Sequence, residues 1–147
     1  MFKRITIIGL GLIGSSIARA IKKNNLCKIL VAHDKSKIVL KKTSKLKITN
    51  HIEPNLKKSV KDSDLVIICT PLGTYKNIVS VIKNNLKKSC ILTDVGSAKI
   101  FVTNTVSKLI NKKTIWIPAH PVAGTEQSGP EAGFADLFKN RWCIITP

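Results

Sequence analysis

The 147-residue sequence predicts an α/β fold with a doubly wound, mainly parallel sheet. Two observations favour this class: strand-like and helix-like segments alternate along the chain, and a glycine-rich turn joins the first strand to the first helix. The length suits one domain with a sizeable core. We therefore expect residues 1–147 to form a single domain built around this sheet.

The first strand is expected over the apolar residues 4–8, and a helix follows it directly. Ile13, Ile17 and Ile21 recur at the spacing of one helical face. The turn between strand and helix carries the pattern GxGxxG over residues 9–14. This pattern is common by itself, but the strand–turn–helix context is the one that a dinucleotide-binding fold of the Rossmann type requires.

Each position in this turn has its own expected role in cofactor binding. Gly9 allows the backbone to turn sharply, Gly11 lets a pyrophosphate approach the main chain, and Gly14 lets the helix pack closely. The free N–H groups at the start of the helix, at Leu12 and Ile13, then face the phosphates. The positive end of the helix dipole favours the same negative charge.

An acidic residue supports this interpretation of the turn. Residues 28–33 read as a second strand, and Asp34 follows at its end, twenty residues after Gly14. An acid at this place accepts hydrogen bonds from the adenosine ribose and repels a 2′-phosphate, so NAD is favoured over NADP. Lys35 and Lys37 leave NADP open, because either side chain could meet a 2′-phosphate.

The remaining elements continue the alternation of helix and strand. Residues 65–70 form a near-continuous apolar run, as expected for a strand that is covered on both faces, and Pro71 ends it. The other expected elements are a short helix at 36–42, a short strand at 46–49, a polar helix or turn at 56–63, an amphipathic helix at 78–86, a strand at 90–93, a helix at 99–110, and strands at 115–117 and 142–145.

Polar motifs follow three of these strands, where ligands collect in doubly wound sheets. They occupy residues 70–73, 94–99 and 119–126, and we expect them to form the rim of one cleft together with the glycine turn. Thr70 and Pro71 are therefore candidate cofactor contacts. The alternative is that these motifs are only loop residues.

Three residues in these motifs, Asp94, Ser97 and His120, need separate consideration. Helix capping is the structural alternative for Asp94 and Ser97. His120 is a titratable group in a Gly/Pro-rich loop at the expected ligand edge, which makes it a candidate functional residue. We interpret His33 as a strand-end residue and His51 as a surface residue.

Composition limits the classes of partner. The net charge is +17, but it comes from 22 Lys and only 3 Arg spread along the chain, so we expect a solvated lysine surface and no nucleic-acid partner. The four cysteines form no CxxC pair; we expect buried free thiols in a cytoplasmic protein and no metal site. No apolar run is long enough for a membrane span, and no signal peptide precedes the first strand.

Three motifs together resemble a known family. Residues 9–16, 94–99 and 120–130 are similar to the corresponding motifs of prephenate and arogenate (cyclohexadienyl) dehydrogenases. The closing segment, 132–147, resembles the bacterial cyclohexadienyl branch. The first motif is generic, whereas the histidine motif in this order with the other two is specific.

The resemblance implies NAD(P)-dependent oxidative decarboxylation in tyrosine biosynthesis, with prephenate or arogenate as the small-molecule substrate. By analogy, His120 accepts the proton of the ring hydroxyl while hydride leaves for the nicotinamide. Ser97 would help to position either His120 or the hydroxyl. Gly96, Thr125 and Glu126 would line the substrate cleft. The resemblance also implies that Asp94 and Lys99 order the loops.

The resemblance also implies a second, helical domain that dimerises and contributes a substrate-binding arginine. We expect this domain to be absent from residues 1–147, where Arg141 is a weak substitute for that arginine, so cofactor binding is expected to survive without turnover and a homodimer only with the helical domain. The other hypotheses are a β-hydroxyacid dehydrogenase type of reductase, which the His120 motif disfavours, and a nucleotide-binding module without chemistry.

Overall fold

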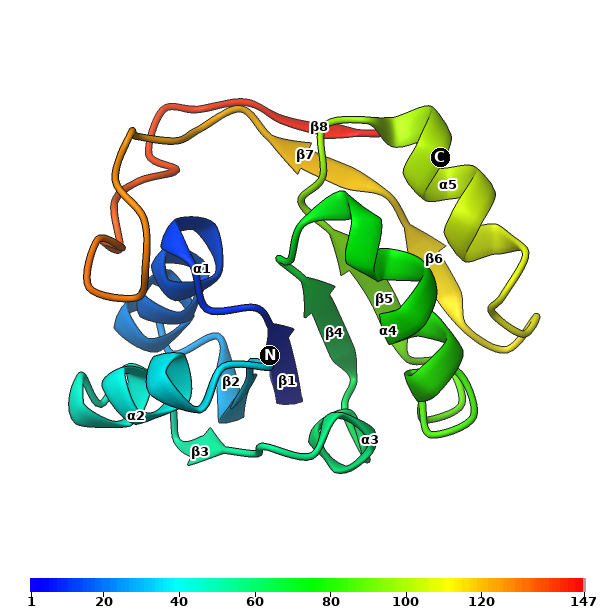
Figure 1. The fold of residues 1–147 in the computed structure, drawn as a ribbon, viewed down its shortest axis with the longest axis horizontal. Helices are drawn as coiled ribbons and strands as arrows, with labels where there is room; N and C mark the ends of the chain where they lie inside the picture. Colours follow the sequence, from blue (N-terminus) through cyan, green and yellow to red (C-terminus); the bar gives the residue numbers. More distant parts are fainter. Residues whose placement is uncertain (147) are drawn as a thin grey trace.

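The computed structural model describes residues 1–146 and places the strands in two sheets (Figure 1). Six parallel strands form the main sheet in the order β3-β2-β1-β4-β5-β6, and β7 and β8 form an antiparallel ribbon. In Figure 1 this ribbon runs across the carboxyl ends of the main strands. The predicted doubly wound parallel sheet is confirmed.

The elements alternate as the sequence indicates. In chain order they are β1 (Phe2–Ile8), α1 (Leu12–Lys23), β2 (Cys27–His33), α2 (Lys37–Lys45), β3 (His51–Ile52), α3 (Leu56–Ser59), β4 (Leu65–Ile68), the 3₁₀ turn η1 (Leu72–Thr74), α4 (Tyr75–Ile82), β5 (Ile91–Asp94), α5 (Lys99–Ser107), β6 (Ile115–Ile117), β7 (Ala119–Pro121) and β8 (Cys143–Ile145). The first strand is central because β2 and β4 pair with it on opposite sides. The strand order therefore reverses between β1 and β4, which is where doubly wound sheets bind ligands.

Successive side chains of β1 point into two separate hydrophobic clusters. Ile7 packs with Ala18 and Ile21 of α1, whereas Ile8 packs with Val79 of α4. All of these side chains are buried. Because strand residues alternate between faces, the two clusters cover both faces of the sheet and hold its carboxyl edge rigidly.

Three expected boundaries are wrong. The strand predicted at 46–49 is a turn instead, since Lys47 adopts a left-handed φ of 51°, and the strand forms later as β3. The helix predicted at 78–86 spans Tyr75–Ile82, and the one predicted at 99–110 ends at Ser107. In both helices the apolar residues beyond the end still pack against the core, so periodicity alone did not locate the end.

The last strand also differs from expectation. β8 does not join the main sheet but pairs with β7, with His120 opposite Ile144. Pro118 separates β6 from β7, and proline interrupts a strand because it lacks the N–H that a ladder needs. His120 therefore lies in a short strand and not in the loop that the sequence predicts.

The cysteines are free, and their environments differ. Cys90 is buried and Cys69 is half-buried, but Cys143 is exposed on β8, which corrects the expectation that its apolar run is buried. No helix within residues 1–146 is long and apolar enough to cross a membrane. The same residues hold no group of three or more metal-ligating side chains.

Candidate functional site

The glycine turn is shaped by contacts that leave no room for side chains. Gly9 has a φ of +94°, and a Cβ there would lie 2.8 Å from the carbonyl oxygen of Cys69. A Cβ on Gly14 would lie 1.9 Å from the carbonyl oxygen of Gly9. At Gly11, by contrast, a Cβ would meet nothing within 4 Å. Two glycines thus build the turn, and the third leaves open space beside it.

Asp34 joins the end of β2 to this turn. Its Oδ2 accepts a hydrogen bond of 2.9 Å from the backbone N–H of Leu10, and its Oδ1 accepts one of 2.9 Å from Ser36. Each carboxylate oxygen has a second lone pair, so the group can still accept hydrogen bonds from a ligand.

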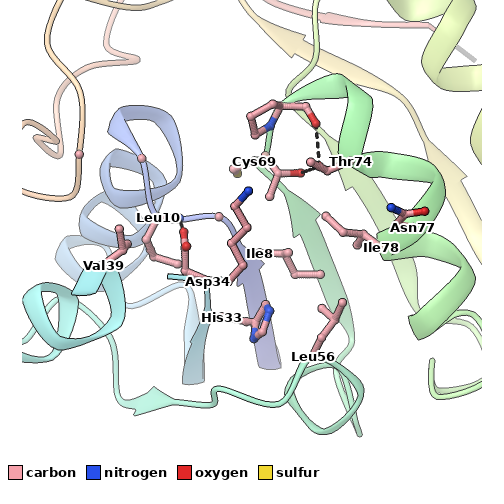
Figure 2. Close-up of a pocket in the computed structure, with 16 residues that line it drawn as sticks. Ile8, Leu10, His33, Asp34, Val39, Leu56, Cys69, Thr74, Asn77 and Ile78 are labelled. Carbon is pink, nitrogen blue, oxygen red and sulfur yellow. Dashed lines mark hydrogen bonds between the residues drawn. The ribbon is translucent and has the colours of Figure 1, made fainter. Parts of the chain in front are cut away.

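A cavity of about 560 Å³ opens at the switch point between β1 and β4 (Figure 2). Among the predicted cofactor residues, Gly9, Gly11, Asp34, Thr70 and Pro71 line it. The lining also includes Lys35, which the sequence indicated as a possible contact of a 2′-phosphate. Other lining residues were not identified from the sequence as site residues, namely Ile8, Leu10, His33, Val39, Leu56, Cys69, Thr74, Asn77, Ile78 and Gly129.

The polar wall of this cavity is ordered by side-chain contacts. Thr74 Oγ1 lies 2.8 Å from Thr70 Oγ1 and 2.7 Å from the carbonyl oxygen of Pro71, as the dashed lines in Figure 2 show. Leu12, Ile13 and Gly14 do not line the cavity, since they form the first turn of α1 beside it.

His120 is held by one ring nitrogen. Its Nδ1 lies 3.1 Å from the carbonyl oxygen of Val95. A carbonyl oxygen can only accept, so Nδ1 carries the proton in this contact and Nε2 remains an acceptor in the neutral ring. The ring is half-buried on the ribbon that crosses the strand ends.

A buried ion pair fixes the residue that precedes His120. Lys99 Nζ lies 2.6 and 2.7 Å from the two oxygens of Asp94 and donates a hydrogen bond of 2.7 Å to the carbonyl oxygen of Ala119. Asp94 Oδ1 accepts a hydrogen bond of 3.2 Å from the N–H of Ala119. The side chain of Asp94 is fully buried and that of Lys99 is 13% exposed. Both backbone groups of Ala119 are therefore anchored to the end of β5.

Tyr75 completes this buried group. Its hydroxyl donates a hydrogen bond of 3.2 Å to Asp94 Oδ2. Burial, together with the neighbouring Asp94 carboxylate, raises the pKa of Tyr75 above its ordinary value. The hydroxyl therefore stays protonated and remains a donor to the carboxylate.

The profile of the prephenate dehydrogenase nucleotide-binding domain matches residues 17–147. The chain belongs to this family.

Its relatives agree with this assignment. The chain is 39% identical over its full length to a cyclohexadienyl dehydrogenase of Zymomonas mobilis, of which it covers 50%. It is 33% identical over 97% of its length to a prephenate dehydrogenase of Bacillus subtilis, of which it covers 39%. The chain thus spans half or less of the length of these curated relatives.

Solved structures share the fold. An arogenate dehydrogenase of Synechocystis superposes with a TM-score of 0.84 at 26% identity, over 98% of this chain and 50% of that one. A prephenate dehydrogenase of Aquifex aeolicus, solved with hydroxyphenyl propionate and NAD+, has a TM-score of 0.83 at 22% identity, over 100% of this chain and 51% of that one.

The motif residues of this chain are not all in one cleft. Thr70 and Pro71 share the first cavity with the glycine turn. Asp94 and Ala119 instead line a second cavity of about 380 Å³, together with Arg141. The motifs therefore line two cavities, and not the single rim that the sequence predicts.

In the described part of the chain, the remaining predicted site residues make no hydrogen bond to His120. Ser97 is exposed and does not cap α5, which begins after Ala98 without a side-chain cap. Thr125 and Glu126 are exposed, and within residues 1–146 no hydrogen bond joins any of these three side chains to His120.

Gly96 and Asp94 contribute to packing in this domain. The N–H of Gly96 donates a hydrogen bond of 2.8 Å to Asp94 Oδ2, and a Cβ on Gly96 would lie 2.4 Å from Leu72 Cδ2. The helix-capping interpretation of Asp94 is also wrong, since its carboxylate binds Lys99, Tyr75 and the backbone.

The segment between β7 and β8 returns across α1. Arg19 donates a hydrogen bond of 2.9 Å to the carbonyl oxygen of Pro130, and the N–H of Phe134 donates one of 3.1 Å to Ser16 Oγ. Through this contact Gly129 reaches the wall of the first cavity. The segment that joins β7 to β8 thus borders the first cavity and is continuous with the ribbon that carries His120.

Proposed function

We propose that this chain binds NAD in the first cavity and is the nucleotide-binding half of a dehydrogenase that oxidises prephenate or arogenate. The observation that carries the proposal is the cavity at the β1–β4 switch point, with the open space at Gly11 beside the Asp34 carboxylate. The family description and the NAD+ in the Aquifex aeolicus structure support it.

The chain's residues suit such a cofactor. Gly11 leaves space for the pyrophosphate, and the N–H groups of Leu12 and Ile13 at the start of α1 provide donors for it. Asp34 accepts hydrogen bonds from the adenosine ribose, while Thr70 and Pro71 form the opposite wall. A 2′-phosphate would be repelled by Asp34, which favours NAD, although Lys35 also lines the cavity.

Calorimetric titration of the 147-residue chain tests this preference. NAD should bind at least about tenfold more tightly than NADP, and Asp34→Ser should narrow that difference by removing the repelling charge. Glu53→Gln, which changes an acid outside the cavity lining, is the matched control. Equal affinities of the unmodified chain for the two dinucleotides would contradict the assignment.

For the reaction, we propose that His120 is the proton acceptor. With Val95 holding Nδ1, the Nε2 lone pair is available to take the proton of the substrate's ring hydroxyl. Bound NAD supplies the acceptor for the hydride, and loss of carbon dioxide makes the ring aromatic. Ser97, Thr125 and Glu126, which are exposed, border the substrate side together with the half-buried Gly96.

We further propose that turnover needs a second, helical domain that dimerises and supplies an arginine to the substrate. The relatives are at least about twice as long as this chain, and apolar side chains are exposed on α5 and the ribbon. They are Ile100, Phe101, Trp142, Ile144 and Ile145. The free cysteines fit a cytoplasmic location.

Rates of NADH formation test both proposals. The 147-residue chain should show little turnover of prephenate at saturation, and a robust rate would show that the substrate site is misplaced. In a protein that joins this chain to a helical domain, His120→Asn should lower kcat by about a hundredfold or more with NAD affinity unchanged, because Asn cannot take the proton. His51→Asn, at an exposed residue, is the control.

A further inference from the structure

His33, the last residue of β2, lies inside the nucleotide cavity. Its side chain is only 7% exposed and lines the cavity with Ile8, Leu56 and Ile78 (Figure 2). The sequence predicts only that His33 ends a strand. It could not show that α3, more than twenty residues further along the chain, encloses the ring.

The hydrogen bond of His33 determines which ring nitrogen is free. Nδ1 lies 2.9 Å from the carbonyl oxygen of Glu53. Because that oxygen only accepts, Nδ1 carries the proton and Nε2 is an acceptor in the neutral ring. Within the part of the chain that the structure describes, no residue donates a hydrogen bond to Nε2.

The surroundings of His33 suit a flat aromatic base. Ile8, Leu56 and Ile78 make this part of the cavity apolar, whereas the glycine turn and Asp34 provide polar groups elsewhere in the same cavity. His33 and Asp34 line the same cavity, so the imidazole lies within the space open to the base of a nucleotide whose ribose is bound by Asp34. Nε2 is accessible from the cavity and receives no hydrogen bond from the described residues, so a ligand N–H there adds a hydrogen bond.

We propose that His33 Nε2 accepts a hydrogen bond from the 6-amino group of adenine and thereby selects adenine over 6-oxopurine bases. This inference rests on the proposed binding of NAD. Adenine presents an N–H donor at position 6, where hypoxanthine presents an oxygen. An oxygen facing Nε2 would leave two acceptors opposed and both unsatisfied, which is a strong basis for discrimination.

Titration with NAD and with nicotinamide hypoxanthine dinucleotide tests the proposal on the 147-residue chain. The unmodified chain should bind NAD about tenfold more tightly, the range expected for one buried hydrogen bond and its unpaired acceptor. His33→Asn should reduce this ratio to near one. Asn can still donate to Glu53 through its amide but has no group at the position of Nε2, so the fold should be retained, as thermal unfolding would show.

His51→Asn is the matched control, since His51 is exposed and outside the cavity lining. A ratio near one in the unmodified chain, or a ratio that survives in a folded His33→Asn variant, would overturn the role of His33 while leaving NAD binding intact. Failure of both dinucleotides to bind the unmodified chain would instead overturn the proposed function, and this inference with it.

Discussion

The glycine-turn cavity and the His120 ribbon lie at the same edge of the sheet but are built differently. The cavity is formed by the ends of β1, β2 and β4, and its shape depends on tight backbone contacts at Gly9 and Gly14. The ribbon lies outside the main sheet and is held by a buried ion pair at the end of β5. The shape of the cavity thus depends on the strands of the main sheet, whereas the position of His120 depends on the ion pair, the Val95 carbonyl and pairing with β8.

The largest expected effect comes from removing that anchor. Lys99→Met leaves the Asp94 carboxylate buried without its cation and should lower the free energy of unfolding by about 3–5 kcal/mol in urea titrations. NAD affinity of the folded variant should remain within about twofold, since neither residue lines the nucleotide cavity.

Lys108→Met is the control for this change, because Lys108 is an exposed lysine at the C-terminal end of α5. It should change the free energy of unfolding by less than about 0.5 kcal/mol. Equal stability of the Lys99 and Lys108 variants would show that the ion pair does not anchor the ribbon.

The next effect concerns the backbone contact inside the glycine turn. Gly14→Ala places a Cβ 1.9 Å from the carbonyl oxygen of Gly9, which cannot move without opening the turn. The free energy of unfolding should fall by about 3 kcal/mol, as in severe overpacking. Gly124→Ala, where a Cβ meets nothing within 4 Å, should be nearly neutral, and similar losses for both variants would disprove the packing explanation.

Gly11→Val should separate binding from folding within the same turn. The new side chain enters open space, so the free energy of unfolding should change by no more than about 1 kcal/mol, the cost of an unfavourable N-cap. It occupies the space proposed for the pyrophosphate, so NAD affinity should fall by at least about tenfold in calorimetry. Unchanged affinity would exclude this approach of the phosphates.

The smallest expected effect concerns Asp64, at the opposite edge of the sheet, and affects stability alone. Hydrogen bonds from Lys87 and from the backbone of Arg4 lower the pKa of Asp64 to about 2, below its ordinary value of 3.8. This group stabilises the fold above the unfolded pKa, and the contribution is lost as pH falls through the folded pKa.

Asp64→Asn should therefore lower the free energy of unfolding by about 1 kcal/mol at pH 7, a discounted value because the pair is partly exposed. The difference from the unmodified chain should shrink between about pH 4 and pH 2. Denaturant titrations across this range check it, with NAD affinity at pH 7 unchanged. A difference that is constant with pH would assign the effect to packing.

Much of the cavity could be predicted because its determinants are local in sequence. The turn at Gly9 and the acid at Asp34 each follow a recognisable strand, and the apolar run that forms β4 lies between helices. Such patterns locate the ends of the strands from the sequence alone. The structure then shows these strand ends side by side.

The ribbon and the base end of the cavity could not be predicted, because both depend on distant partners. β7 is a strand only through pairing with β8, whose Ile145 lies opposite Ala119. His33 is buried by Leu56, and the carbonyl that orients its ring belongs to Glu53. Neither short segment carries a period of its own that would indicate these contacts.

The cysteines described above make the chain selective toward alkylating reagents. Thiolates are the reactive form, and burial raises the pKa of Cys69 above its ordinary value and that of Cys90 to about 11. Cys27 is shifted in the same direction. Cys143 alone among the four is exposed, and it lies opposite Pro121, next to His120. A maleimide fluorophore would therefore attach beside the candidate catalytic residue without engineering of the sequence.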